Sequence, residues 1–160
     1  MKSLILALAV CATMSAQDAT ATFGQFKGTL ANGKTFKTYN LEYSQPLTDL
    51  GIAKVSGKAS IVFDADETYG TTKFGYNNWG FGLDADRSYK NFDYGVGVSY
   101  VTEALTAGML KEDDEQSYWN WHVKYNFKNY VFGYKVEKAF GTPSGYSLNK
   151  STTLSVGIKF

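Results

Sequence analysis

Alternation of apolar and polar residues with a period of two is the feature that most limits the fold of this sequence. In residues 152–160, TTLSVGIKF, the large apolar residues fall on one face, and Ser155, Gly157 and Lys159 fall on the other. The pleat of a β-strand imposes this pattern. The alternation recurs along the chain, and 16 Gly with 12 Tyr and 11 Phe favour strands and turns over helices. We therefore expect an all-β fold whose last strand is paired to its final residue, Phe160.

The first 17 residues have the layout of a secretory signal peptide. Lys2 precedes an apolar run from Leu4 to Val10, and small residues follow it. The apolar run is too short to cross a bilayer as a helix. We expect cleavage between positions 15 and 18, which leaves one domain, residues 18–160.

The mature chain is expected to carry no cysteine and no net charge. Cys11 lies in the export signal, so no disulfide and no thiolate metal site remains after cleavage. Removal of Lys2 leaves 15 basic residues against 15 acidic ones, and no basic run indicates a nucleic-acid partner. No apolar run approaching 18 residues follows the signal. If the chain enters a membrane, it must do so as a β-barrel.

The alternation predicts about ten strands, most of them near the length with which a tilted strand crosses a hydrocarbon core. The expected strands are Thr20–Leu30, Lys34–Gln45, Ile52–Phe63, Thr68–Tyr76, Trp79–Arg87, Phe92–Val101, Ala104–Lys111, Ser117–Phe127, Tyr130–Phe140 and Asn149–Phe160. Connections on the side of the termini are expected at Gln45–Gly51, Asn77–Asn78, Thr102–Glu103 and Lys128–Asn129. Those on the opposite side are expected at Ala31–Gly33, Asp64–Glu67, Ser88–Asn91, Glu112–Gln116 and Gly141–Leu148. Eight strands remain if the first stays outside the barrel and another weak one is lost.

Each strand has one apolar and one polar face, which fits a soluble barrel or sandwich and also a membrane barrel with a polar interior. Two patterns favour the membrane barrel. Glycines cluster on the polar face, where they would make room for long charged side chains inside a narrow barrel. Aromatic residues on the apolar face concentrate towards strand ends, as bilayer interfaces select. The aromatic residues expected at the two interfaces are Tyr43, Phe63, Tyr76, Trp79, Phe92, Tyr100, Trp119, Phe127, Tyr130 and Phe140.

The last strand provides a third argument for a membrane barrel. Its apolar face, Leu154, Val156, Ile158 and Phe160, resembles the assembly signal of bacterial outer-membrane β-barrel proteins. The resemblance implies an antiparallel up-and-down barrel that is exported through the periplasm and inserted into the outer membrane by the barrel assembly machinery. It also implies contact with outer-membrane lipid and lipopolysaccharide.

Charged residues on the inward face are the candidates for function. The residues expected to line the lumen are Glu42, Lys54, Lys58, Asp84, Asp86, Asp93, His122, Lys124, Lys135 and Glu137. Balanced charges in a low-dielectric lumen must pair or be hydrated, so ion pairs fill the lumen or a thin wet channel remains. The glycines favour the channel, and the resemblance to small porin-like proteins implies passive diffusion of small solutes or ions. A non-conducting structural or surface-interaction barrel and a soluble ligand-binding barrel are the alternatives.

No group of residues indicates catalysis, a cofactor or a metal site. His122 is the sole histidine, and residues 122–124, HVK, lack the serine of the His-x-Ser motif of small outer-membrane lipid deacylases. A buried histidine that makes hydrogen bonds is expected instead. The acids within 64–67 lack the further ligands of a calcium loop, and those at 112–115 are typical of a solvated loop. We therefore expect a protein that is not an enzyme.

Overall fold

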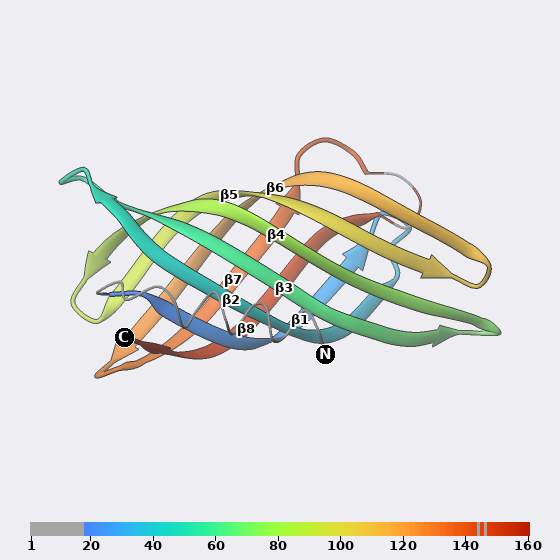
Figure 1. The fold of residues 1–160 in the computed structure, drawn as a ribbon, viewed down its shortest axis with the longest axis horizontal. Helices are drawn as coiled ribbons and strands as arrows, with labels where there is room; N and C mark the ends of the chain where they lie inside the picture. Colours follow the sequence, from blue (N-terminus) through green and yellow to red (C-terminus); the bar gives the residue numbers. More distant parts are fainter. Residues whose placement is uncertain (1–17, 144, 146) are drawn as a thin grey trace.

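The computed structural model describes residues 18–143, 145 and 147–160, and the expected export signal lies outside them. Within these residues, eight antiparallel strands close into a barrel in which β1 also pairs with β8 (Figure 1). The strands are β1 (Thr20–Leu30), β2 (Thr35–Asp49), β3 (Lys54–Tyr69), β4 (Thr72–Tyr89), β5 (Phe92–Ala107), β6 (Leu110–Phe127), β7 (Tyr130–Ala139) and β8 (Leu148–Lys159). The described part of the chain has no helix that could span a membrane.

The two ends of the barrel differ in shape. The terminus end, on the left of Figure 1, holds the start of β1, the end of β8 and the connections 50–53, 90–91 and 128–129. The hairpin end holds the connections 31–34, 70–71, 108–109 and 140–147. β3 to β6 have 16 to 18 residues, whereas β1, β7 and β8 have 10 to 12. A four-stranded sheet formed by β3 to β6 therefore extends past the other strands at the hairpin end.

The strand number is the alternative of eight and not the first expectation of ten. Thr20–Leu30 is strand β1 of the barrel wall, whereas the alternative of eight strands assumed that this segment stays outside the barrel. β4 runs without a turn through Asn77–Asn78, and β5 does the same through Thr102–Glu103. The connections expected at Asp64–Glu67 and Glu112–Gln116 lie within β3 and β6.

Inward-facing polar side chains explain why those turns were wrongly expected. The side chains of Asn78 and Glu103 are buried in the lumen, where Asn78 Nδ2 donates to the Tyr76 hydroxyl at 2.7 Å. Polar residues within a lumen strand look like turn residues in the sequence, because both avoid lipid. Loss of the one reversal expected at 77–78 also moves the 90–91 turn to the terminus end, opposite to the side expected for Ser88–Asn91.

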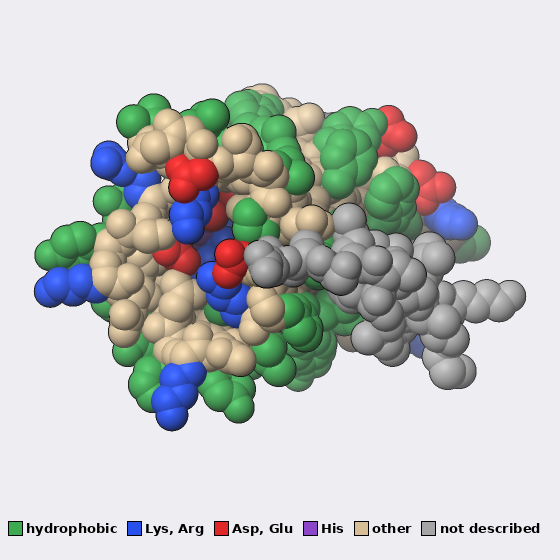
Figure 2. Space-filling view, turned by 60° about the vertical axis from the view of Figure 1, so that its left-hand side comes forward, with side chains coloured by type: hydrophobic (Ala, Val, Ile, Leu, Met, Phe, Trp, Pro, Cys, Tyr) green, Lys and Arg blue, Asp and Glu red, His purple; other side chains and the backbone are tan. Residues whose placement is uncertain are grey.

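The outer surface of the barrel is apolar over a broad band (Figure 2). Its exposed large side chains include Phe23, Tyr39, Trp79, Phe81, Leu83, Phe92, Tyr94, Val96, Val98, Trp119, Trp121, Phe132, Tyr134, Leu154, Val156 and Ile158. A contiguous apolar surface of this extent is unfavourable in water. The closed ladder satisfies the backbone within that band, so the exterior fits the hydrocarbon of a bilayer.

The first and last described residues close the barrel together. β1 and β8 pair from Thr20 opposite Lys159 onward. The Phe160 amide donates to the Ala19 carbonyl at 2.9 Å, so pairing continues to the end of the chain, as the alternation predicted. Lys159 Nζ lies 2.9 Å from Asp18 Oδ1, and this hydrogen bond and charge lower the pKa of Asp18.

An aromatic cluster, Phe26, Phe36, Phe74 and Tyr76, fills the lumen at the hairpin end. The centroid of the Phe36 ring lies 4.7 Å from the ring centroid of Tyr76, 5.4 Å from that of Phe74 and 6.1 Å from that of Phe26. All four side chains are at most 2 % exposed. This half of the lumen is therefore packed like the core of a soluble protein.

Replacement of Phe36 should test the packing of this cluster. Phe36→Ala leaves a cavity that lipid cannot fill, and we expect it to lower the free energy of unfolding by about 3–5 kcal/mol. Phe81→Ala is the matched control, since Phe81 is 57 % exposed on the lipid side and acyl chains can fill the space. Urea unfolding of the refolded barrel in lipid measures both, and an equal loss would contradict the packed interior.

Candidate functional site

A buried ion pair lies at the centre of the polar half of the lumen, towards the terminus end. Lys58 Nζ on β3 lies 2.6 Å from Asp84 Oδ1 on β4. Asn120 on β6 approaches the same oxygen over Gly97 of β5, and its Nδ2 donates to Asp84 Oδ1 at 3.2 Å. All three side chains are buried, so the carboxylate and the ammonium compensate each other away from bulk water.

His122 joins this ion pair to a second carboxylate. Its Nδ1 lies 2.9 Å from Asn120 Oδ1, and its Nε2 contacts Asp86 Oδ1. Lys124 Nζ lies 3.7 Å from the other oxygen of Asp86. Both ring nitrogens have structural partners, as expected for a buried hydrogen-bonding histidine, and no serine stands beside the ring in the described contacts. Nor does any described group of His, Cys, Asp and Glu side chains form a metal site.

Lys135 on β7 organises a second set of charges on the opposite wall. Its Nζ lies 2.5 Å from Glu42 Oε2 and 3.3 Å from Glu137 Oε1. Ser151 on β8 donates through Oγ to Glu137 Oε2 at 3.2 Å. One ammonium thus forms ion pairs with two carboxylates, and the second carboxylate also accepts a hydrogen bond from a hydroxyl group.

The remaining two residues expected in the lumen lie at the mouth of the terminus end. Lys54 is exposed at the start of β3. Asp93 is half-buried and accepts hydrogen bonds of 2.6 Å from Ser88 Oγ and from Asn126 Nδ2. Charged side chains are visible inside this mouth in Figure 2, surrounded by the backbone rim and the apolar exterior.

Glycines make room for these charges, as their position on the polar face predicted. A Cβ atom at Gly82 would lie 2.8 Å from Lys58 Cε, and one at Gly97 would overlap Asp84. A Cβ atom at Gly95 would lie 3.0 Å from His122 Nε2. The glycines therefore serve close packing of the charged side chains and leave no empty space beside them.

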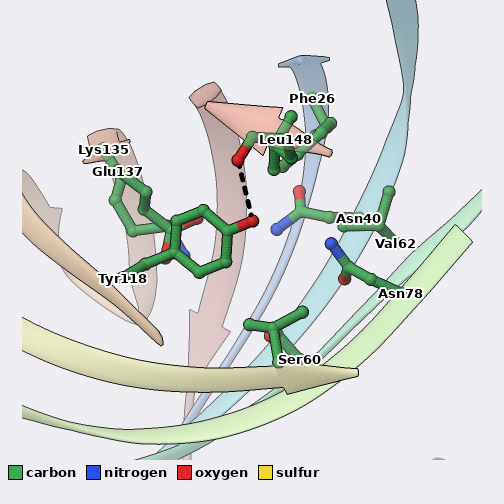
Figure 3. Close-up of a pocket in the computed structure, with 10 residues that line it drawn as sticks. Phe26, Asn40, Ser60, Val62, Asn78, Tyr118, Lys135, Glu137 and Leu148 are labelled. Carbon is green, nitrogen blue, oxygen red and sulfur yellow. Dashed lines mark hydrogen bonds and ion pairs between the residues drawn. The ribbon is translucent and has the colours of Figure 1, made fainter. Parts of the chain in front are cut away.

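Tyr118 and Glu103 mark the level at which the polar half meets the aromatic cluster. The Tyr118 hydroxyl contacts the Glu103 carboxylate and donates to the Leu148 carbonyl at 3.1 Å (Figure 3). The Leu148 amide donates to Glu103 Oε2 at 3.3 Å, which ties the start of β8 to β5. Sequence reasoning missed these contacts and the aromatic cluster beside them. Phe26, Phe36 and Phe74 share the inward phase of their strands and could have indicated the cluster.

The cavities between these side chains are small. One of about 10 Å³ lies among Asn40, Asn78, Tyr118 and Leu148 in Figure 3. Another of about 20 Å³ is lined by Asn40, Thr153 and residues of the charged half. Asn40 Oδ1 and Thr153 Oγ1 are buried without a partner among the described residues, and each cavity has room for about one water molecule.

The ten aromatic residues expected at the interfaces lie at different levels. Tyr76 was wrongly assigned: it is 1 % exposed inside the lumen, because β4 is one continuous strand in which residue 76 shares the inward face of Asp84. Phe63 and Phe140 lie towards the hairpin end, and Trp79, Tyr100 and Trp119 lie near the middle of their strands. Tyr43, Phe92, Phe127 and Tyr130 lie towards the terminus end. Phe92 thus lies at the end opposite to the one that ten strands required, and Trp79 and Tyr100 lie at neither end because β4 and β5 are continuous.

The apolar face of the last strand points outward. Leu154, Val156, Ile158 and Phe160 are each about half exposed or more, on the surface that fits lipid. Their side chains are available for contact with a membrane or with another protein, and their role in assembly stays a prediction.

The sheet that extends beyond the barrel is the most prominent feature of the hairpin end. Residues 110–116 of β6 pair with β5 alone, because β7 ends at Ala139 and the Phe140 amide donates to the Ser117 carbonyl. Lys111, Asp113, Asp114 and Glu115 occupy this edge, and charges on an unpaired edge oppose aggregation. At the tip of the β5–β6 hairpin, Met109 is fully exposed.

Comparison with known proteins places the fold among small outer-membrane barrels. No family model and no curated protein sequence matches the chain. The attachment invasion locus protein Ail of Yersinia pestis, solved with the heparin analogue sucrose octasulfate, has a TM-score of 0.58 at 13% identity, over 91% of this chain and 99% of that chain. Neisserial surface protein A has a TM-score of 0.60 at 15% identity, over 89% and 96%. The expected resemblance is confirmed at the level of fold.

Removal of Asp84 should test the buried ion pair. Asp84→Ala leaves the Lys58 ammonium buried in the lumen without a carboxylate partner, and we expect a loss of about 3–5 kcal/mol in the free energy of unfolding. Asp66→Ala is the control, since Asp66 is an exposed acid on β3. Adding Lys58→Met to Asp84→Ala should recover part of the loss in urea unfolding, and no recovery would argue against an unpaired charge as the cause.

Proposed function

We propose that this chain is an outer-membrane barrel that does not conduct solutes and that acts at the cell surface through its hairpin end. The observation that carries the proposal is the closed lumen. Each of the eight strands contributes at least one buried apolar side chain to the hairpin half of the lumen: Phe26, Leu30, Phe36, Val62, Ala65, Phe74, Tyr76, Val101, Leu105, Ala107, Tyr118, Ala139 and Leu148.

The burial of these side chains argues against a continuous water path. A channel wide enough for water would expose the side chains along it, yet each of these is at most 6 % exposed. Hydrated ions would have to pass Phe36 and Tyr76, whose ring centroids lie 4.7 Å apart. A pore through this layer would require the cluster to come apart.

A narrow porin-like channel for small solutes or ions is the second candidate, and it rests on the inward charges. In the polar half, however, Lys58 pairs with Asp84 and Lys135 pairs with Glu42. Charges that neutralise one another at these distances hold the strands in place and offer little attraction to a passing ion.

The likeness in fold and the apolar exterior support a location in the outer membrane. The two similar proteins are described as an attachment invasion locus protein and a surface protein, which supports a role at the surface without catalysis. In this proposal an export signal at residues 1–17 leads the chain to the periplasm. The barrel assembly machinery then recognises the strand that ends at Phe160.

Conductance of the refolded barrel in a planar lipid bilayer tests the closed lumen. After an unboiled gel shift has confirmed folding, we expect no discrete current steps. The positive control is Phe26→Ser, Phe36→Ser and Phe74→Ser together, which removes the rings and should give salt-dependent steps. Steps from the unchanged protein, with an ion selectivity that shifts in the variant Lys54→Gln, Lys58→Gln, would instead support the channel.

Amine labelling of intact cells tests the orientation. Lys73 and Lys111 are exposed on the extended sheet, whereas Lys90 and Lys128 are exposed in turns of the terminus end. We expect a membrane-impermeant amine reagent to label the first pair in intact cells and both pairs after permeabilisation, as read by mass spectrometry. Labelling of Lys90 and Lys128 alone in intact cells would reverse the orientation.

A further inference from the structure

Four lysines form a row on the outside of the barrel, at the hairpin-end border of the apolar band. They are Lys37 on β2, Lys27 on β1, Lys150 on β8 and Lys138 on β7, and all are exposed. In the sequence they lie far apart, and only closure of β1 on β8 makes their strands consecutive. We call them the lysine row.

The register places these lysines side by side. Lys27 is directly opposite Lys37 in the β1–β2 ladder, and Lys138 is directly opposite Lys150 in the β7–β8 ladder. Lys27 faces Thr152 across β1–β8, so Lys150 is its diagonal neighbour. Directly opposed residues have Cβ atoms about 5 Å apart, and diagonal neighbours lie about 7–8 Å apart. Like charges at such spacing are unfavourable unless an anion lies over them.

No described acid relieves this repulsion. None of the four lysines forms an ion pair with another residue of the described chain. Acids at the same end belong to the other half of the circumference, on β3 and β6, and two of them have local partners there. Asp64 accepts from Asn77 Nδ2 at 2.6 Å, and Glu115 contacts the Tyr100 hydroxyl. The border of the apolar band is therefore basic over β7, β8, β1 and β2.

The level of the lysine row matches the headgroup region of a membrane. Tyr39 is the next outward residue below Lys37 on β2, and Leu154 lies two outward positions below Lys150 on β8. Trp119 is directly opposite Lys138 in the β6–β7 ladder and is exposed. Apolar and aromatic side chains thus begin where the lysines end, which is the depth at which lipid phosphates meet hydrocarbon.

We propose that the lysine row binds the phosphate groups of the phosphorylated glycolipid of the outer leaflet, lipopolysaccharide. The inference rests on the proposed location, because it requires the hairpin end to face the outer leaflet. Lipopolysaccharide carries several phosphates on one headgroup and several acyl chains below it. One molecule can therefore supply anions to neighbouring lysines while its chains cover Tyr39 and Trp119.

Binding of purified lipopolysaccharide to the refolded barrel in zwitterionic detergent tests the inference. A ligand that binds the folded state raises the midpoint of thermal unfolding, and a titration gives its affinity. Each basic side chain near an anionic lipid surface contributes about fivefold in affinity. We therefore expect the variant Lys27→Gln, Lys37→Gln, Lys138→Gln, Lys150→Gln to bind nearly three orders of magnitude more weakly, about fivefold for each lysine.

Two matched variants control for charge and folding. Lys73→Gln, Lys90→Gln, Lys111→Gln, Lys128→Gln makes the same change in net charge away from the lysine row and should bind like the unchanged protein. Replacement of the four row lysines by arginine keeps the charge and should retain binding. An unboiled gel shift confirms that each variant is folded before the titration.

Ligand variants identify the source of the phosphate. Dephosphorylated lipopolysaccharide should lose the effect, and phosphatidylglycerol at equal charge should raise the midpoint much less. Equal binding by the lysine-row variant, equal loss in the charge-matched control, or equal stabilisation by phosphatidylglycerol would overturn the inference. The titration does not depend on conductance, so a barrel that conducts and also binds through these lysines would refute the proposed function and leave the lysine row standing.

Discussion

Closure of the backbone hydrogen-bond ladder is the constraint on which the rest of this structure depends. An outer surface made of Phe, Trp, Tyr and Val is stable against lipid only where no strand edge is left unpaired at that depth. Pairing of β1 with β8, continued by the Phe160 amide to Ala19, meets that condition. With eight tilted strands, the interior of a closed barrel is just wide enough for side chains to fill it. The inward residues therefore decide whether anything passes.

The inward residues divide the lumen into a half that is filled by ion pairs and a half that is filled by apolar side chains. At the terminus end, glycines allow Lys58, Asp84 and His122 to approach closely, and each charge finds a partner that offsets its loss of water. At the hairpin end, aromatic rings pack against each other without charges. Tyr118 and Glu103 join the halves, with a hydroxyl and a carboxylate facing one side and apolar neighbours on the other. A filled interior leaves the outer surface and the extended sheet as the places where contact with other molecules can occur.

The sequence predicted the strands, their two faces and most of the inward charges, because the period of two is a local property of the pleat. It predicted eight strands only as the alternative to ten, and it did not predict the aromatic cluster. Asn77–Asn78 and Thr102–Glu103 have the composition of turns, yet their inward members are buried in the lumen. Asn78 donates to the Tyr76 hydroxyl of its own strand, and Glu103 contacts Tyr118 on β6. Tyr76 was assigned to lipid because its strand was expected to end there. The burial of Asn78, Glu103 and Tyr76 depends on the other strands that close the barrel around them, and no window of neighbouring residues contains those strands.

The lysine row shows the same division between local pattern and tertiary structure. The sequence alone predicted an all-β chain that is exported and that is neutral and free of cysteine once its signal is removed, since those predictions follow from composition and from the geometry of a single strand. It also contained no basic run, and Lys27, Lys37, Lys138 and Lys150 were unremarkable one by one. Strand order, register and closure brought them together, because hydrogen bonds between distant strands fix which residues become neighbours on the barrel surface.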